Sequence, residues 1–294
     1  MKLAVIDIGS NAIRFQVTNI LQYKGVDHFK RLEYVRFPLR LGHDVFTSGR
    51  LKSKRIEKFQ KLMKAFALLI ELYEVDQYMT CATSAMRESE NGQQVALEIK
   101  DLTGLEIQII DGKEEAKLIN KAISEHLDEK LSYVHIDVGG GSTELNVIRK
   151  GELIGSKSFQ IGSVRRMDQL DTPQMWSEMD NWITDVTDPT QLQTAIGTGG
   201  NINTLFELGG KVKGEHMSIS ELKDVKKMLI DTSLDDRIYK LQLNPDRADV
   251  IIPASEIYIS VMERGDINDI IVPDVGLKDG MIKMLYERHS QIVG

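Results

Sequence analysis

Hydrophobic and polar positions along this chain follow two kinds of pattern, one typical of strands and the other typical of helices. Short apolar runs that end at an aspartate occur twice, as LAVIDIGSN at residues 3–11 and as VHIDVGGGST at residues 134–143. Each run leads into a loop of small residues and then into a second apolar stretch, which is typical of strand, turn and strand. The pattern predicts the beginning of a sheet at each of the two places.

The two aspartate-ended runs are copies of each other. Asp7 aligns with Asp137 and Gly9 with Gly139, which is an offset of 130 residues in both cases. A third apolar stretch follows each copy after a lysine-glycine pair, at residues 24–25 and 150–151, and such pairs predict tight turns. Two meanders with the same aspartate at the same place indicate a duplicated domain rather than a short-period repeat.

Helical periodicity appears between the predicted strands. Residues 51–75 and 114–127 carry apolar side chains at spacings of three and four, which predicts helices with one face in a core. The pattern gives an α/β fold of two domains. We expect domain I at residues 1–124, completed by a C-terminal helix at 279–294, and domain II at residues 125–278.

Composition narrows the class of protein. The 294 residues are 41% hydrophobic and 28% charged, with a net charge of −7 and one cysteine, Cys81. This acidic balance argues against general binding to DNA or to an anionic membrane, and no apolar run reaches the length of a membrane span. The first apolar run stops at Asp7, too early for a signal peptide. With a single cysteine, a reducing cytoplasmic location is expected.

The duplicated aspartates ask for a chemical reason, because aspartate is unfavourable in strands. One alternative is that Asp7 and Asp137 each cap a turn with the side chain. The functional alternative is a ligand for metal or water beside a phosphate-binding loop, since Mg²⁺ is held by one or two carboxylates together with substrate phosphates.

The loops after the two aspartates are GSNAIR, with Gly9 and Ser10, and GGGSTE. Backbone N–H groups exposed at glycine turns bind anions, and hydroxyl groups add hydrogen-bond donors. Neither loop has the Walker A sequence, and the position of the third Rossmann glycine is Glu144. Two such loops in a duplicated fold predict a phosphate clamp.

The stretch IIDGKEEAKLI, at residues 109–119, is the most informative for mechanism. Asp111 and Glu114 fit a capping box at a helix start. This local role accounts for Glu114 and leaves Glu115 for another one. A carboxylate in the first helical turn is favoured in its ionised form and could orient or deprotonate a water molecule.

Three arginines and a further glycine loop complete the candidates for phosphate binding. Arg87, just beyond a predicted strand, could bind phosphate with two hydrogen bonds. Arg14 lies on the second strand, and Arg40 follows a proline; surface positions remain an alternative for all three arginines. The segment LQTAIGTGG, at residues 192–200, ends a strand in a small-residue loop that contains Gly199.

Six motifs in order, DIGSNAIR, CATSAMRE, DGKEEAKLI, IDVGGGSTEL, FQIGSVR and IGTGGNINTL, resemble the exopolyphosphatase and guanosine pentaphosphate phosphohydrolase (Ppx/GppA) family. The resemblance covers nearly the whole chain. It is to the short two-domain form, without the C-terminal HD-type domain of longer members. It implies two duplicated actin-like, ribonuclease H-like α/β domains with the site in an inter-domain cleft.

The resemblance also implies roles for individual residues. The catalytic glutamate of the family falls on Glu115, and its magnesium-binding carboxylates fall on Asp137 and Glu144. The remaining matches are to phosphate-binding positions: Asp7, Asn11, Arg40, Arg87, Gly140, Gly141, Ser142 and Thr143. Ala12 and Lys278 depart from the serine and arginine that the family usually has at these places.

The function expected from the sequence is Mg²⁺-dependent hydrolysis of a terminal phosphoanhydride, most simply orthophosphate release from inorganic polyphosphate. Removal of the 5′ γ-phosphate of guanosine pentaphosphate (pppGpp) is the close alternative. A kinase of the same superfamily and a non-catalytic polyphosphate or alarmone sensor remain alternatives, and association as a homodimer stays open.

Overall fold

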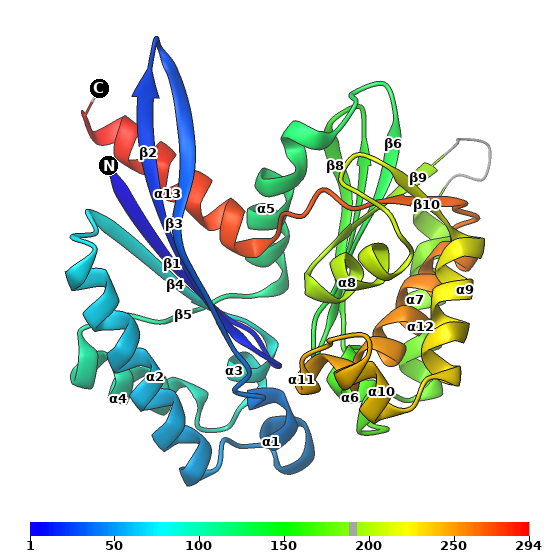
Figure 1. Ribbon diagram of the computed structural model, residues 1–294, viewed down its shortest axis with the longest axis horizontal. Helices are drawn as coiled ribbons and strands as arrows, with labels where there is room; N and C mark the ends of the chain where they lie inside the picture. Colours follow the sequence, from blue (N-terminus) through cyan, green and yellow to red (C-terminus); the bar gives the residue numbers. More distant parts are fainter. Residues whose placement is uncertain (188–192, 294) are drawn as a thin grey trace. The chain divides into compact units, whose positions relative to one another are not determined.

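The computed structural model describes residues 1–187 and 193–293 and divides the chain into two compact units (Figure 1). Unit 1 contains residues 1–122 together with the chain from Leu277 onward, and unit 2 is Ile123–Gly276. The predicted segments that begin at Leu192 and end at Gly294 extend beyond the described residues at those two positions.

Unit 1 is built on one sheet, whose described strands have the order β3-β2-β1-β4-β5. The first three strands form an antiparallel meander, and β4 and β5 continue the sheet in parallel with β1. The elements of unit 1 are β1 (Lys2–Ile8), β2 (Ile13–Tyr23), β3 (Val26–Phe37), α1 (Leu41–Ser48), α2 (Ser53–Leu72), β4 (Gln77–Ala82), α3 (Ser84–Glu88), α4 (Gly92–Thr103), β5 (Gln108–Ile109), α5 (Gly112–Ile123) and α13 (Leu277–Val293).

Unit 2 repeats this plan in the strand order β10-β11-β9-β6-β7-β8. Strands β6, β7 and β8 form the antiparallel meander, and β9 and β11 are parallel to β6. The elements of unit 2 are η1 (Ser124–His126), β6 (Ser132–Val138), β7 (Thr143–Arg149), β8 (Glu152–Phe159), α6 (Ser163–Met167), α7 (Pro173–Val186), β9 (Gln193–Thr198), α8 (Gly200–Leu208), β10 (His216–Ser218), α9 (Ile219–Asp231), α10 (Leu234–Tyr239), α11 (Pro245–Ala248), α12 (Ile251–Arg264) and β11 (Asp269–Ile271).

Both predicted lysine-glycine turns form hairpins. Lys24 and Gly25 have φ values of 51° and 78°, and Lys150 and Gly151 have 52° and 76°. Two successive left-handed residues make the type of turn whose twist matches that of the two strands, and glycine at the second position lowers its cost.

The predicted helical stripes form the cores. In unit 1, Phe59, Met63 and Phe66 of α2 are buried against one face of the sheet, where Ile6 and Ile8 lie. Helix α13 packs against β1, β2 and β4, so that the last helix of the chain belongs to the fold of the first strands (Figure 1).

In unit 2, Val134, Ile136 and Val138 point into a core formed with helices such as α12. Because side chains alternate along a strand, His135 and Asp137 lie on the other face of that sheet. The predicted fold class, a duplicated α/β architecture with one sheet in each domain, is confirmed. Within the described residues, no helix is long and apolar enough to cross a membrane.

Candidate functional site

The unit 1 loop, residues 9–12, connects β1 to β2. The N–H of Gly9 donates to the carbonyl of Ala12 at 3.3 Å and closes a tight turn. Asp7 stands opposite Arg14 in the strand register, and Arg14 Nη1 lies 2.9 Å from Asp7 Oδ2. The charge of the buried Asp7 is therefore balanced by its neighbour on the next strand.

The start of α1 covers the unit 1 loop. The N–H groups of Arg40 and Gly42 donate to the carbonyls of Asn11 and Ser10, both at 2.8 Å. A Cβ atom on Gly42 would lie 2.9 Å from Ser10 Cβ, so that this close packing requires glycine. Arg40 adopts a left-handed φ of 57° at the point where the chain turns into the helix.

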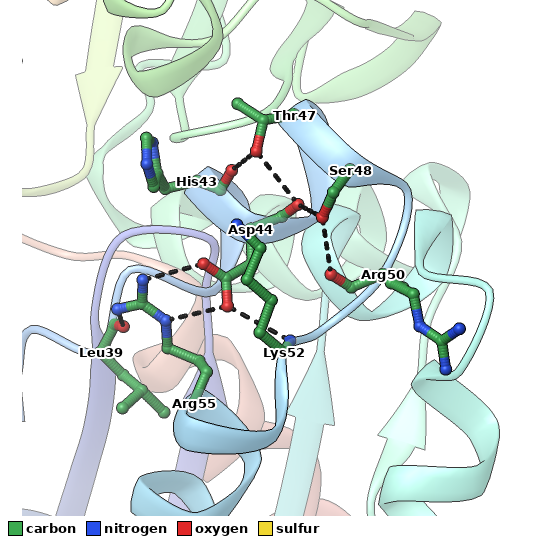
Figure 2. Close-up of polar contacts among 8 residues, drawn as sticks. All are labelled: Leu39, His43, Asp44, Thr47, Ser48, Arg50, Lys52 and Arg55. Atoms are coloured by element: carbon green, nitrogen blue, oxygen red, sulfur yellow. Dashed lines mark hydrogen bonds and ion pairs between the residues drawn. The ribbon is translucent and has the colours of Figure 1, made fainter.

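A half-buried ion pair holds α1 in place (Figure 2). Arg55 donates from Nη2 to Asp44 Oδ1 at 3.0 Å and from Nη1 to the carbonyl of Leu39 at 2.6 Å. Burial alone would raise the pKa of Asp44, but the hydrogen bonds and charges of Arg55 and Lys52 together outweigh it and lower that pKa. This pair ties the segment that covers the unit 1 loop to the first turn of α2.

Helix α5 presents Glu115 at its first turn. The carboxylate of Asp111 accepts hydrogen bonds from the N–H groups of Lys113 and Glu114 at 2.8 and 2.9 Å, which caps the helix. Glu114 is exposed, whereas Glu115 is buried with 7% of its surface accessible. The helix start therefore leaves the first glutamate of the pair exposed and buries the second.

Arg87 lies beside Glu115. Its Nη1 is 3.8 Å from Glu115 Oε2 and donates a hydrogen bond of 2.9 Å to the carbonyl of Ile110. The guanidinium group compensates a carboxylate charge that burial would otherwise penalise.

Cys81 on β4 is a buried thiol whose pKa responds to the acidic groups of unit 1. Burial raises the pKa of the Cys81 thiol to about 12, and the negative charges of Asp7, Glu114 and Glu115 add to the rise. Asp7 is the register partner of Cys81 on the neighbouring strand, and Glu115 on α5 is close enough for its charge to act on the thiol.

The unit 2 loop, residues 139–142, repeats the turn of the unit 1 loop. The N–H of Gly139 donates to the carbonyl of Ser142 at 2.9 Å, which is the hydrogen bond of Gly9 moved by 130 residues. Asp137 stands opposite Glu144 in the β6–β7 register. Directly opposed residues have Cβ atoms ~5 Å apart on one sheet face, so the two carboxylates are neighbours.

Glu144 is held by two hydroxyl groups. Ser142 and Ser158 donate to Glu144 Oε1 at 2.6 and 2.9 Å, and Glu144 is buried with 3% of its surface exposed. Thr143, a predicted phosphate-binding residue, donates its hydroxyl hydrogen to the carbonyl of Ile161 at 2.6 Å. The hydroxyl groups of both predicted residues thus have partners within the unit.

Close packing over the unit 2 loop requires a glycine at position 162. The three loop glycines, residues 139–141, are not among the described residues that have a left-handed φ. A Cβ atom on Gly162 would lie 2.5 Å from the carbonyl oxygen of Gly140, so the chain before α6 passes directly over the loop. Arg165, which is buried, donates from Nε to the carbonyl of Gly141 at 2.9 Å.

Gly199 lies against Asp137. It follows Thr198, the register partner of Asp137 on β9, and it has a left-handed φ of 93°. A Cβ atom at this position would lie 2.9 Å from Asp137 Oδ1. Any other residue at 199 would therefore crowd the Asp137 carboxylate as well as strain the backbone.

The donor set of Asp137 and Glu144 fits a magnesium ion that arrives with a phosphate ligand. Within residues 1–187 and 193–293, no group of three or more histidine, cysteine or acidic side chains could hold a metal by itself. Mg²⁺ is commonly bound by one or two carboxylates, with water and substrate phosphates completing the octahedron. Two neighbouring carboxylates on one face of a sheet meet this requirement.

The predicted residues thus fall into two groups, one in each unit. In unit 1, the structure brings together Asp7 with Arg14 and Arg87 with Glu115. In unit 2, the group contains Asp137, Glu144, Gly199 and the loop itself, residues 139–142.

Three residues outside the predicted set of site residues support these groups. The hydroxyl groups of Ser84 and Ser10 are 2.8 Å apart and link two candidate loops of unit 1. Ser158 bonds to Glu144, and Arg165 holds the unit 2 loop from inside the fold. Arg165 stands in the motif FQIGSVR, so the sequence contained a signal for it, although not for its burial.

Comparison with known proteins gives a consistent result. Residues 20–289 match the model of the Ppx/GppA phosphatase family. Exopolyphosphatase 1 of Mycobacterium leprae is 22% identical, and the match covers 96% of this chain and 88% of that protein. The guanosine-5′-triphosphate,3′-diphosphate pyrophosphatase of Photobacterium profundum is also 22% identical, with 98% of this chain and 59% of that protein covered.

Other curated relatives are matched over a smaller part, and the chain spans only 25% to 42% of their length. Among solved structures, an exopolyphosphatase from Cytophaga hutchinsonii superposes with a TM-score of 0.83 over 98% of both chains. Because the two sequences are 24% identical, this match shows that the two folds are similar.

Proposed function

Because the chain belongs to the Ppx/GppA phosphatase family, we propose that it hydrolyses a terminal phosphoanhydride and releases orthophosphate from inorganic polyphosphate. The observation that carries this choice is the match to an exopolyphosphatase over 96% of this chain and 88% of the relative. We also propose a cytoplasmic setting, in which the free thiol of Cys81 stays reduced.

Glu115 is the proposed general base. It would take a proton from the attacking water as the terminal phosphorus–oxygen bond breaks and the shortened polyphosphate leaves. Its burial, the compensating charge of Arg87 and its place in the first turn of α5 support this role. The exposed neighbour Glu114 lacks this environment.

Asp137 and Glu144 are the proposed ligands of Mg²⁺. When bound, the ion would neutralise charge on the phosphoryl oxygens of the substrate. The role of the protein is to hold two carboxylates in fixed positions. The hydroxyl groups of Ser142 and Ser158 orient Glu144, and Gly199 leaves room for Asp137.

The remaining candidates would hold the phosphate chain. Backbone N–H groups in the two glycine loops and the guanidinium groups of Arg87 and Arg40 supply donors of the kind that bind phosphate oxygens. Arg14 has a different part, because its charge is paired with Asp7 and so balances the start of the unit 1 loop.

The second candidate substrate is pppGpp, from which the same chemistry would remove the 5′ γ-phosphate. It is favoured by the match to a guanosine-5′-triphosphate,3′-diphosphate pyrophosphatase over 98% of this chain. That match covers 59% of the relative, against 88% for the exopolyphosphatase, which is why polyphosphate comes first.

The test is an orthophosphate-release assay with polyphosphate, pppGpp and ATP, each with Mg²⁺ and with EDTA. We expect Mg²⁺-dependent release, fastest from polyphosphate. Faster release from pppGpp would make pppGpp, rather than polyphosphate, the preferred substrate. Binding of either compound without any release would instead indicate a sensor, and ATP consumption that requires a hydroxyl acceptor would indicate a kinase.

A further inference from the structure

A chain of buried polar groups lies beneath the carboxylate pair of unit 2. His135 is hydrogen-bonded through Nε2 to Thr198 Oγ1 and through Nδ1 to the side-chain amide of Asn146, both at 2.9 Å. The three residues are at most 1% exposed. Because His135 and Asp137 are two positions apart on β6, this chain lies on the same sheet face as the Asp137 carboxylate.

Tyr258 of α12 reaches the same strand ends from the other face of the sheet. Its side chain belongs to the hydrophobic core on that face and is fully buried. The hydroxyl donates to the carbonyl of Thr198 at 2.8 Å and accepts from the N–H of Val138 at 3.3 Å. Burial, with the charges of Asp137 and Glu144, keeps the pKa of Tyr258 well above its ordinary value.

Thr198 is consequently clamped on two sides, and its position governs that of Asp137. The two residues are register partners at the ends of β9 and β6. The next residue, Gly199, already approaches Asp137 so closely that a Cβ atom would lie 2.9 Å from Oδ1. A shift of β9 against β6 by a few tenths of an ångström would therefore move the Asp137 carboxylate relative to Glu144.

Unit 1 shows that the fold does not require this arrangement. The residue 130 positions before His135 is Val5, and the register partner of Asp7 on β4 is Cys81. A buried network of histidine, threonine and tyrosine is costly unless all its groups are satisfied, so its occurrence in one copy alone calls for a local reason. Unit 2 alone carries two opposed carboxylates at this place.

We propose that Tyr258 and His135 are positioning residues that clamp Thr198 and thereby set the geometry of Asp137 toward a divalent cation. The inference rests on the proposed magnesium-dependent function of the carboxylate pair. It concerns groups that touch neither substrate nor metal and act through the ends of β6 and β9. Partners that orient metal ligands from behind commonly change metal affinity or activity by about 10- to 100-fold when removed.

The test compares two hydroxyl deletions in the same unit. Tyr258→Phe removes the clamp. Tyr133→Phe is the matched control, because Tyr133 is a buried tyrosine on β6 whose hydroxyl accepts one backbone hydrogen bond, from Asp128 at 3.0 Å. Two readouts are used: the Mg²⁺ concentration for half-maximal orthophosphate release, and that for half-maximal rise in melting temperature with inorganic triphosphate in a Glu115→Gln background.

We expect Tyr258→Phe to raise both Mg²⁺ concentrations about tenfold, and Tyr133→Phe to leave both within about twofold of the parent protein. Amide hydrogen exchange at Val138 should quicken in Tyr258→Phe alone. Equal Mg²⁺ titrations for the two folded variants would overturn the proposal. If the parent protein releases no orthophosphate, the proposed function fails, but the melting-temperature titration still tests the positioning role of Tyr258. If Mg²⁺ does not stabilise the parent protein, both the proposed function and the positioning role are overturned.

Discussion

At the end of β1, Asp7 faces Arg14, whereas at the equivalent place in unit 2, Asp137 faces Glu144. The backbones of the two places match, down to the hydrogen bond from Gly9 to Ala12 and from Gly139 to Ser142. The residue across the ladder is a cation in unit 1 and an acid in unit 2. Unit 1 therefore closes its loop with a balanced ion pair, and unit 2 places two acids together.

The difference shows how the two copies in a duplicated fold can take different roles. An aspartate paired with arginine needs no further partner and makes a stable support for the unit 1 loop. Two neighbouring carboxylates repel each other unless a cation or a shared proton lies between them. The comparison therefore supports the proposal that unit 2 binds the metal and that Glu115 of unit 1 transfers the proton.

The largest expected effect tests this division of work. Glu115→Gln keeps the size of the side chain and removes its basicity, so orthophosphate release should fall ~10²- to 10⁴-fold while substrate binding persists. The control is Glu114→Gln, one residue earlier and exposed, which should stay within about threefold of the parent. Equal rates for the two variants would remove Glu115 as the base.

Much of this comparison could be predicted from the sequence. The offset of 130 residues aligned Asp7 with Asp137 and, carried further, sets Arg14 against Glu144. Duplicated strands, lysine-glycine hairpins and helical stripes depend on local patterns, and such patterns are visible along the chain.

What could not be predicted depends on irregular or distant contacts. Counting back from the turn at residues 150–151 would pair Glu144 with Lys157, but the ladder shifts between Val147 and Ile148, and Ser158 becomes the partner. Tyr258 is 120 residues from the Val138 amide that it binds. Local sequence does not contain such a contact, because it arises from tertiary packing of α12.

The second prediction concerns the metal. Asp137→Asn should raise the Mg²⁺ concentration needed for half-maximal activity about tenfold, because a site with only two carboxylates loses half of its charge. Asp7→Asn, the same change at the equivalent place in unit 1, should lower the maximal rate without moving the Mg²⁺ requirement. Parallel titrations measure both, and an unmoved curve for Asp137→Asn would leave that residue as a turn cap.

The third prediction uses the acid sensitivity of unit 2. Burial lowers the pKa of His135 from 6.5 to about 3. The unfolded chain therefore takes up a proton below pH 6.5 that the folded chain refuses until about pH 3. Stability from this residue is complete above pH 6.5 and falls by about 1.4 kcal/mol for each pH unit below it.

His135→Val gives unit 2 the residue that unit 1 has at Val5. The variant should be less stable at pH 7, since Thr198 and Asn146 lose their partner, but its stability should decline less steeply with acid. Urea unfolding at pH 7.5, 6.5, 5.5 and 4.5 (values chosen about the ordinary histidine pKa) measures the two slopes. Identical slopes would show that another group causes the acid loss.

The smallest expected effect is on the free energy of unfolding of the metal-free protein, which the same substitution should change in opposite directions in the two units. Asp7→Asn removes the anion paired with Arg14 and should lower the free energy of unfolding by about 0.5–1 kcal/mol. Asp137→Asn removes one of two opposed like charges and should raise it by a similar ~0.5–1 kcal/mol. Urea unfolding in EDTA at low ionic strength measures both. Added salt should shrink the two effects together, because screening weakens attraction and repulsion alike. If both variants were destabilised equally, Asp137 and Glu144 would already share a compensating partner, and the contrast between the two loops would lie in their hydrogen bonds rather than in their charge.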